Sequence, residues 1–212
     1  MTVAEDFASV LARCKVIPVA QFDDPIAAIR TAEILLKHGI GILEITLRSD
    51  AAFNSILAVC REIPGMLVGA GSVLSVESLD RACDAGARFG VSPCFDETVV
   101  ERAVSSRIPF IPGAATPTEL ARALHQTAIV KIFPASLLGG PEYIKAVVAP
   151  FRMMDFYLVP TGGINAENYL EYLKQERVVA VGMSYPVESS LIQKSDFAAV
   201  EERVKSIAAS LQ

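Results

Sequence analysis

Eight short apolar runs recur along this chain, and each is followed by a segment with helical spacing. The runs are Lys15–Ala20, Gly41–Arg48, Leu67–Ser72, Phe89–Pro93, Phe110–Gly113, Ile129–Phe133, Phe156–Thr161 and Val178–Ser184. The helical segments are Asp24–Lys37, Asp50–Glu62, Ser75–Ala85, Asp96–Ser105, Pro117–Leu124, Gly140–Val148, Asn165–Lys174 and Asp196–Ser210. Strands that alternate with helices in this way form parallel sheets. The pattern predicts an α/β fold, a (β/α)8 TIM barrel, with a doubly wound open sheet as the alternative.

A short amphipathic helix over Ala4–Arg13 is expected to lead into the barrel. Several of the other helices begin with a capping residue, such as Asp24, Ser75 and Asn165. The 212 residues suit one barrel, and a hydrophobic content of 52% provides for a large core. Short connections and the lack of low-complexity stretches give no reason to divide the chain, so we expect a single domain over residues 1–212.

Composition excludes several classes of function. The net charge of −5 and the lack of any basic run argue against a nucleic-acid partner. No apolar run is long enough to span a bilayer, and the N-terminus lacks the pattern of a signal peptide, so we expect a cytoplasmic protein with no membrane partner. Four widely spaced cysteines favour reduced thiols, and two distant histidines argue against a metal site. These residues are Cys14, Cys60, Cys83, Cys94, His38 and His125.

A lysine, Lys131, lies in the middle of the buried-looking run Ile129–Phe133. Period two places it on the same face as Ile129 and Phe133. Burial disfavours the charged form of an amine, so free amine exists near neutral pH, and this is the form that attacks a carbonyl to make a Schiff base. The alternative is a lysine at a strand end that reaches solvent or takes part in a structural ion pair.

The second strand carries Glu44, Thr46 and Arg48 on one face, with leucine and isoleucine on the other. In a barrel the polar face points inward, where these residues make little sense as packing. We interpret Glu44 as a general acid/base beside Lys131, and Arg48 as the binding site for a carboxylate. A buried Glu–Arg ion pair that stabilises the barrel is the alternative.

Small and polar residues mark the other strand ends, where barrel active sites lie. Gly69-Ala70-Gly71-Ser72, Ser92-Pro93-Cys94 and Pro112-Gly113 follow the third, fourth and fifth strands. The seventh and eighth strands end in Thr161-Gly162-Gly163 and in Ser184, where barrels commonly bind phosphate through backbone N–H groups. The alternative for the glycines is a tight turn. Neither a dinucleotide fingerprint nor a phosphate loop of the nucleotide-binding type is present.

Five of these motifs occur together in the order and spacing of one known family. They are Leu43-Glu44-Ile45-Thr46-Leu47-Arg48, Gly69-Ala70-Gly71-Ser72, Ile111-Pro112-Gly113, Lys131-Ile132-Phe133-Pro134-Ala135 and Pro160-Thr161-Gly162-Gly163-Ile164. From Cys14 to Ser184 the chain resembles the class I 2-keto-3-deoxy-6-phosphogluconate (KDPG) aldolases, also described as KDPG/4-hydroxy-2-oxoglutarate aldolases.

The resemblance implies a trimeric barrel enzyme without metal or cofactor, acting on a phosphorylated keto sugar acid and pyruvate. It implies that Lys131 forms the Schiff base and that Glu44 moves the protons. It also implies a set of substrate-binding residues, in which the first two hold the carboxylate and the last three hold the phosphate. The set is Arg48, Ser72, Pro93, Phe133, Thr161, Gly162, Gly163 and Ser184.

Three residues depart from the family pattern: Ser72 replaces threonine, Cys94 stands where glycine is expected, and Ser136 stands where glutamate is common. They leave the aldehyde half of the substrate open. The alternatives are the galactonate epimer of the same phospho-sugar acid, or 4-hydroxy-2-oxoglutarate. More distant alternatives are a phosphate-binding barrel isomerase or synthase, and a sugar-acid sensor.

Overall fold

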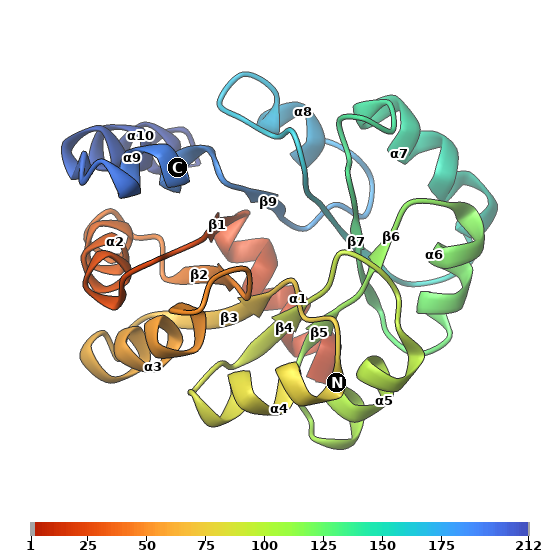
Figure 1. The fold of residues 1–212 in the computed structure, drawn as a ribbon. Coiled ribbons are helices and arrows are strands. Elements are labelled where there is room, and N and C mark those ends of the chain that lie inside the picture. The colour runs from red at the N-terminus through yellow and green to blue at the C-terminus, as the bar shows by residue number, and fades with distance from the viewer. Residues whose placement is uncertain (1–2, 212) are drawn as a thin grey trace.

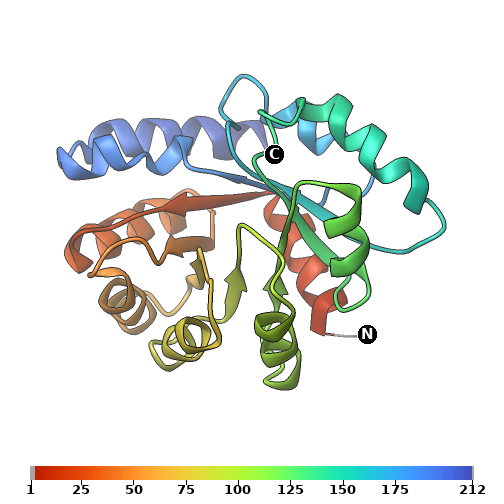
Figure 2. The same cartoon turned by 45° about the vertical axis from the view of Figure 1, so that its right-hand side comes forward.

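The computed structural model describes residues 3–211, in which short parallel strands alternate with helices around a closed ring (Figure 1; Figure 2). The strands are β1 (Val16–Ala20), β2 (Ile42–Thr46), β3 (Leu67–Gly71), β4 (Phe89–Val91), β5 (Phe110–Ile111), β6 (Gly113–Ala114), β7 (Ile129–Ile132), β8 (Tyr157–Pro160) and β9 (Val181–Met183). The α-helices are α1 (Val3–Cys14), α2 (Pro25–Lys37), α3 (Ala52–Glu62), α4 (Val76–Asp84), α5 (Glu97–Ser105), α6 (Pro117–Leu124), α7 (Gly140–Val148), α8 (Tyr169–Leu173), α9 (Ser189–Gln193) and α10 (Phe197–Ser210). Two 3₁₀ turns, η1 (Ala149–Phe151) and η2 (Tyr185–Val187), follow α7 and β9.

The strands close into a barrel. One sheet has the order β5-β4-β3-β2-β1-β9, and a second has the order β6-β7-β8. The two sheets meet where β5 continues into β6. They meet again at two isolated bridges, one from Leu158 of β8 to Val178 and one from Thr161 to Gly182 of β9. Because β9 also pairs with β1, the ring has no open edge. The predicted (β/α)8 barrel is confirmed, and the open doubly wound sheet is wrong.

The fifth strand differs from the expectation of one run over Phe110–Gly113. It is split at Pro112, which has no N–H to donate to a sheet. Ahead of the proline, β5 pairs with β4, whereas after it β6 pairs with β7. The carbonyl of Pro112 accepts a hydrogen bond from the backbone N–H of Lys131 at 2.8 Å, which keeps the ring continuous. The fifth strand of the barrel therefore changes its pairing strand at the proline, from β4 to β7.

The helix expected over Asn165–Lys174 is shorter than predicted, since α8 begins only at Tyr169. The side chain of Asn165 accepts from the N–H of Glu167, and that of Asn168 accepts from the N–H of Asn165, both at 2.9 Å. These side-chain bonds form a turn that competes with the first helical turn. Asn165 is therefore a turn residue and not a helix cap. By contrast, Asp24 and Ser75 cap α2 and α4 as predicted.

The amino-terminal end of the barrel is filled by apolar side chains. Helix α1, which lies behind the strands in Figure 1, buries Phe7 and Leu11. The ring of Phe7 lies 5.1 Å from that of Phe89 inside the barrel. Packing at this end leaves the carboxyl ends of the strands for a site. None of the helices within residues 3–211 combines the length and apolar character that crossing a bilayer requires.

Candidate active site

Lys131 and Glu44 face each other inside the barrel. They come from β7 and β2, which are not neighbours in either sheet, so they meet across the interior. The Lys131 Nζ lies 3.9 Å from the Glu44 Oε1, and the two residues are only 5% and 2% exposed. The same Nζ lies 5.2 Å from the centre of the Phe133 ring. A buried amine beside a buried carboxylate can combine nucleophilic attack with proton transfer.

The position of the Glu44 carboxylate depends on Gly71 of β3. A Cβ atom on Gly71 would lie 2.1 Å from the Glu44 Oε1, far inside contact distance. On the same strand, a Cβ on Gly69 would lie 2.2 Å from the Phe89 ring. Side chains of the neighbouring strands β2 and β4 therefore fill the space beside these two glycines, which leaves no room there for a ligand.

Arg48 follows β2 at the mouth of the barrel, with its side chain exposed to solvent. Its Nε donates a hydrogen bond to the Ser72 Oγ at 2.8 Å. Ser72 has a left-handed backbone, with φ of +57°, which turns its hydroxyl toward the arginine. Within residues 3–211 no carboxylate pairs with Arg48, so a planar cationic fork is available to an incoming anion.

A cavity of about 230 Å³ opens at the carboxyl ends of β1, β2, β8 and β9. Its walls include six of the eight predicted substrate-binding residues: Arg48, Phe133, Thr161, Gly162, Gly163 and Ser184. Thr46 also lines it, two residues after Glu44, and Phe133 stands two residues after Lys131. Residues two apart share a strand face, so the buried pair lies one layer below this cavity.

Two predicted residues lie outside the cavity wall. Ser72 is hydrogen-bonded to Arg48. Pro93 is half-buried after β4, with its carbonyl packed against Gly113. Two residues that the sequence did not single out, Gln21 and Ser189, line the cavity instead. Gln21 follows β1 directly, so its place at a strand end was a usable signal. Ser189 begins α9, a helix of five residues that is too short to show a periodic pattern.

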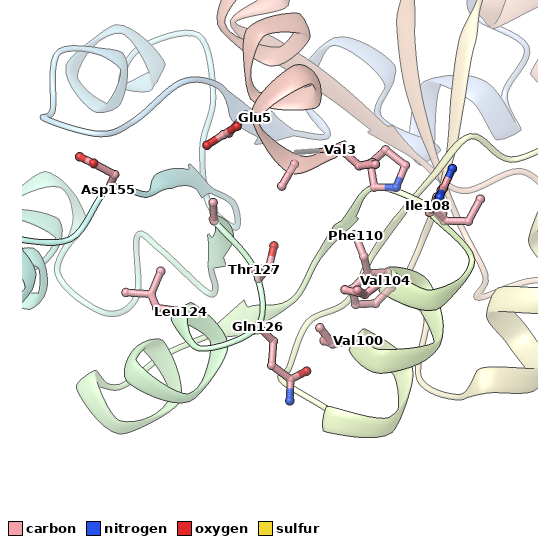
Figure 3. Close-up of a pocket in the computed structure, with 14 residues that line it drawn as sticks. Val3, Glu5, Val100, Val104, Ile108, Phe110, Leu124, Gln126, Thr127 and Asp155 are labelled. Atoms are coloured by element: carbon pink, nitrogen blue, oxygen red, sulfur yellow. The ribbon is translucent and has the colours of Figure 1, made fainter. Parts of the chain in front are cut away.

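A second cavity, of about 430 Å³, lies where strands begin (Figure 3). Its walls come from the first turn of α1, from α5, and from the segments ahead of β5, β7 and β8. The labelled side chains in Figure 3 are mostly apolar, with Glu5 and Asp155 at one side. None of the predicted site residues lines it. The smaller cavity above Lys131 and Glu44 is therefore the candidate active site. No group of histidine, cysteine, aspartate and glutamate side chains within residues 3–211 could hold a metal ion.

Known proteins resemble this chain over most of its length. A family model described as KDPG and KHG aldolase matches residues 7–203. A 2-dehydro-3-deoxy-phosphogluconate aldolase of Treponema pallidum is 41% identical over 191 residues, which cover 90% of each chain.

Two solved structures show the same fold at similar identity. A KDPG aldolase from Legionella pneumophila, with pyruvate captured as a covalent carbinolamine intermediate, is 34% identical with a TM-score of 0.89 and covers 94% of this chain and 97% of its own. The 2-keto-3-deoxy-6-phosphogluconate aldolase of Zymomonas mobilis, solved with 3-phosphoglycerate, is 32% identical with a TM-score of 0.90 and covers 99% and 97%.

Proposed function

The chain belongs to the KDPG and KHG aldolase family, and on that premise we propose that Lys131 and Glu44 carry out its reaction. The reaction is the cleavage of 2-keto-3-deoxy-6-phosphogluconate (KDPG) to pyruvate and glyceraldehyde 3-phosphate, which makes the protein a carbon–carbon lyase. The observation that carries the assignment is the buried pair itself, with the amine and the carboxylate 3.9 Å apart below a cavity at the strand ends.

Cleavage begins when the neutral Lys131 amine attacks the C2 ketone of the substrate. Glu44 moves the protons that allow the carbinolamine to lose water, which leaves a protonated imine. The imine withdraws electrons as the C3–C4 bond breaks, and Glu44 takes the proton of the C4 hydroxyl, directly or through a water. The aldehyde leaves, the enamine is protonated at C3, and water releases pyruvate and the free lysine.

The two ends of the substrate are held by different strand ends. Arg48, oriented by Ser72, binds the carboxylate next to the reacting ketone. Gly162 and Gly163, with φ of +99° and +73°, and the Ser184 hydroxyl bind the phosphate at the far end. Phe133 and Thr161 line the cavity between these two ends. Pro93, which follows β4 outside the cavity wall, is assigned to substrate binding on the resemblance alone. Fixing both ends holds the scissile bond between the amine and the carboxylate.

Two related substrates share the pyruvate half, the galactonate epimer of KDPG and 4-hydroxy-2-oxoglutarate. The loop at Gly162 and Gly163, here called the glycine loop, favours a phosphorylated substrate. 4-Hydroxy-2-oxoglutarate carries no phosphate, and its far carboxylate, at C5, lies closer to the reacting carbons than the phosphate on C6 of KDPG. Steady-state kinetics with the three compounds tests this, with pyruvate release coupled to lactate dehydrogenase. We expect kcat/KM to be highest for KDPG, and an enzyme that cleaves none of the three contradicts the proposal.

We further propose that residues 1–212 form one cytoplasmic aldolase domain that assembles as a homotrimer. Exposed apolar residues support an oligomer. Ile26 in the first turn of α2 is 73% exposed, and Leu74 and Leu137 in the loops after β3 and β7 are 59% and 87% exposed. The four free cysteines fit a reducing compartment. Analytical ultracentrifugation tests the trimer, which has three times the chain mass of 22.7 kDa, and a monomer contradicts it.

A further inference from the structure

We propose that Ser136 is a positioning residue for the phosphate end of the site. Its hydroxyl, held in turn by Tyr172, fixes the peptide between Gly163 and Ile164 so that the amide of this peptide faces the substrate phosphate. The inference rests on the proposed function and adds to it two residues that do not touch the substrate.

The loop after β7 binds the carbonyls of the loop after β8. The backbone N–H of Ala135 donates to the Thr161 carbonyl at 2.8 Å, and that of Ser136 donates to the Gly162 carbonyl at 3.0 Å. The Ser136 hydroxyl then donates to the Gly163 carbonyl at 2.8 Å. Three successive carbonyls of the glycine loop are thus held by two residues.

Fixing these carbonyls also fixes the direction of the amides. In a trans peptide the N–H points opposite to the C=O of the same unit. With the carbonyls of Gly162 and Gly163 held by the β7 loop, the N–H groups of Gly163 and Ile164 point to the other side, where both residues line the cavity. Neither N–H donates to another residue within residues 3–211. Successive backbone amides that converge in this way form an anion-binding nest.

The Ser136 hydroxyl is itself held by a buried tyrosine. Its oxygen lies 3.0 Å from the Tyr172 hydroxyl, and Tyr172 is 1% exposed. Serine has one hydroxyl hydrogen, which goes to the Gly163 carbonyl, so Tyr172 must be the donor to the serine oxygen. The hydrogen bonds therefore run from Tyr172 of α8 through Ser136 to the Gly163 carbonyl. The same carbonyl also accepts a hydrogen bond from the side-chain amide of Asn168 at 3.1 Å.

Ser136 occupies the space that a side chain at position 163 would need. A Cβ on Gly163 would lie 2.6 Å from the Ser136 Cβ and 2.8 Å from its Oγ, so the serine packs directly against the bare glycine. Serine at this position is also one of the departures from the family pattern. The contact and the hydrogen bond act together on one peptide, the one between Gly163 and Ile164.

The test compares the two halves of the substrate in Ser136→Ala and Tyr172→Phe. We measure KM for KDPG, and the pyruvate concentration that gives half-maximal borohydride trapping, which involves no phosphate. Loss of the bond to the Gly163 carbonyl is expected to raise KM for KDPG about tenfold relative to the pyruvate value in Ser136→Ala. Tyr172→Phe is expected to raise KM for KDPG about threefold relative to the pyruvate value, because the serine hydroxyl remains.

Tyr169→Phe is the matched control. Tyr169 is also a buried tyrosine of α8 that bonds to a serine hydroxyl, but its partner is Ser210 at the end of α10, away from the glycine loop. This variant is expected to leave the ratio of the two values unchanged, and thermal unfolding of all variants reports any general loss of stability. If Ser136→Ala does not fold, Tyr172→Phe alone decides.

A ratio that stays at the wild-type value in the Ser136 and Tyr172 variants overturns the positioning role, as does an equal change in Tyr169→Phe. Failure of the proposed function gives a different result, since the wild-type enzyme then shows no borohydride-trapped pyruvate at all.

Discussion

Substitution of Gly71 by alanine tests whether the position of the Glu44 carboxylate matters for turnover. The added methyl would lie 2.1 Å from the Glu44 Oε1, and ordinary contacts begin at 3.4 Å, so the carboxylate has to retreat by about 1.3 Å. A displacement of about 1 Å in a reacting group lowers the rate about 10²-fold. This corresponds to about 2.7 kcal/mol of transition-state stabilisation. Overpacking in the barrel interior is expected to lower the free energy of unfolding by about 1–3 kcal/mol as well.

Gly41→Ala is a matched control, because a Cβ there meets nothing closer than 3.7 Å. Both variants are assayed for kcat on KDPG by coupled release of pyruvate, and for stability by thermal unfolding. Gly71→Ala is expected to lose about 10²-fold in kcat, while Gly41→Ala stays within about twofold.

A shorter carboxylate should reduce the clash, because the contact with Oε1 at 2.1 Å is lost and the closest remaining contact is at the Cγ position, 2.8 Å from the added methyl. In Gly71→Ala/Glu44→Asp the acid is withdrawn by one methylene, so the double variant is expected to exceed Gly71→Ala in kcat, although Glu44→Asp alone is slower than wild type. A wild-type kcat in Gly71→Ala contradicts a proton-transfer role for Glu44, because a group that carries protons could not be displaced without loss of rate.

Three further predictions follow from contacts within the barrel and at its rim. Glu44→Gln should still trap pyruvate with borohydride but turn over KDPG about 10²- to 10⁴-fold more slowly, and a rate near wild type reassigns the carboxylate to structure. Arg48→Ala should raise the pyruvate concentration for half-maximal trapping at least about tenfold, with little change in melting temperature because the side chain is exposed; an unchanged value excludes the arginine from carboxylate binding. Hydrogen bonds from Arg203 and Ser190 hold the pKa of Glu188 below its ordinary value, so its stabilising effect is present at neutral pH and lost as pH falls through the lowered pKa. The melting temperature of Glu188→Gln should therefore lie slightly below wild type at neutral pH and converge with it in acid, and a gap that widens in acid contradicts this pairing.

The buried lysine and glutamate could be singled out from the sequence because they break a local rule. Lys131 and Glu44 are charged residues in runs that otherwise have the pattern of buried strands. Packing in an apolar interior does not explain a charged side chain at either position. Their distance could not be predicted, since β7 and β2 are remote in sequence and meet only when the ring closes. The space that Gly71 leaves for Glu44 depends on the register between β2 and β3, which a single sequence does not specify.

Other differences have equally local causes. The split at Pro112 follows from the missing N–H of proline, so it could have been anticipated once both neighbouring strands were known. The delayed start of α8 arises from two asparagine side chains that bond to backbone amides instead of capping a helix. The five-residue α9, with the cavity residue Ser189, is too short to produce a periodic signal.

The proposed mechanism depends above all on a covalent bond between Lys131 and the substrate. Wild-type protein, Lys131→Met and Glu44→Gln are each incubated with pyruvate and borohydride, and their intact masses are measured. We expect one pyruvyl adduct on the wild type and on Glu44→Gln, mapped to the peptide that contains Lys131, and none on Lys131→Met. An adduct on Lys131→Met, or no adduct on the wild type, contradicts the proposed mechanism.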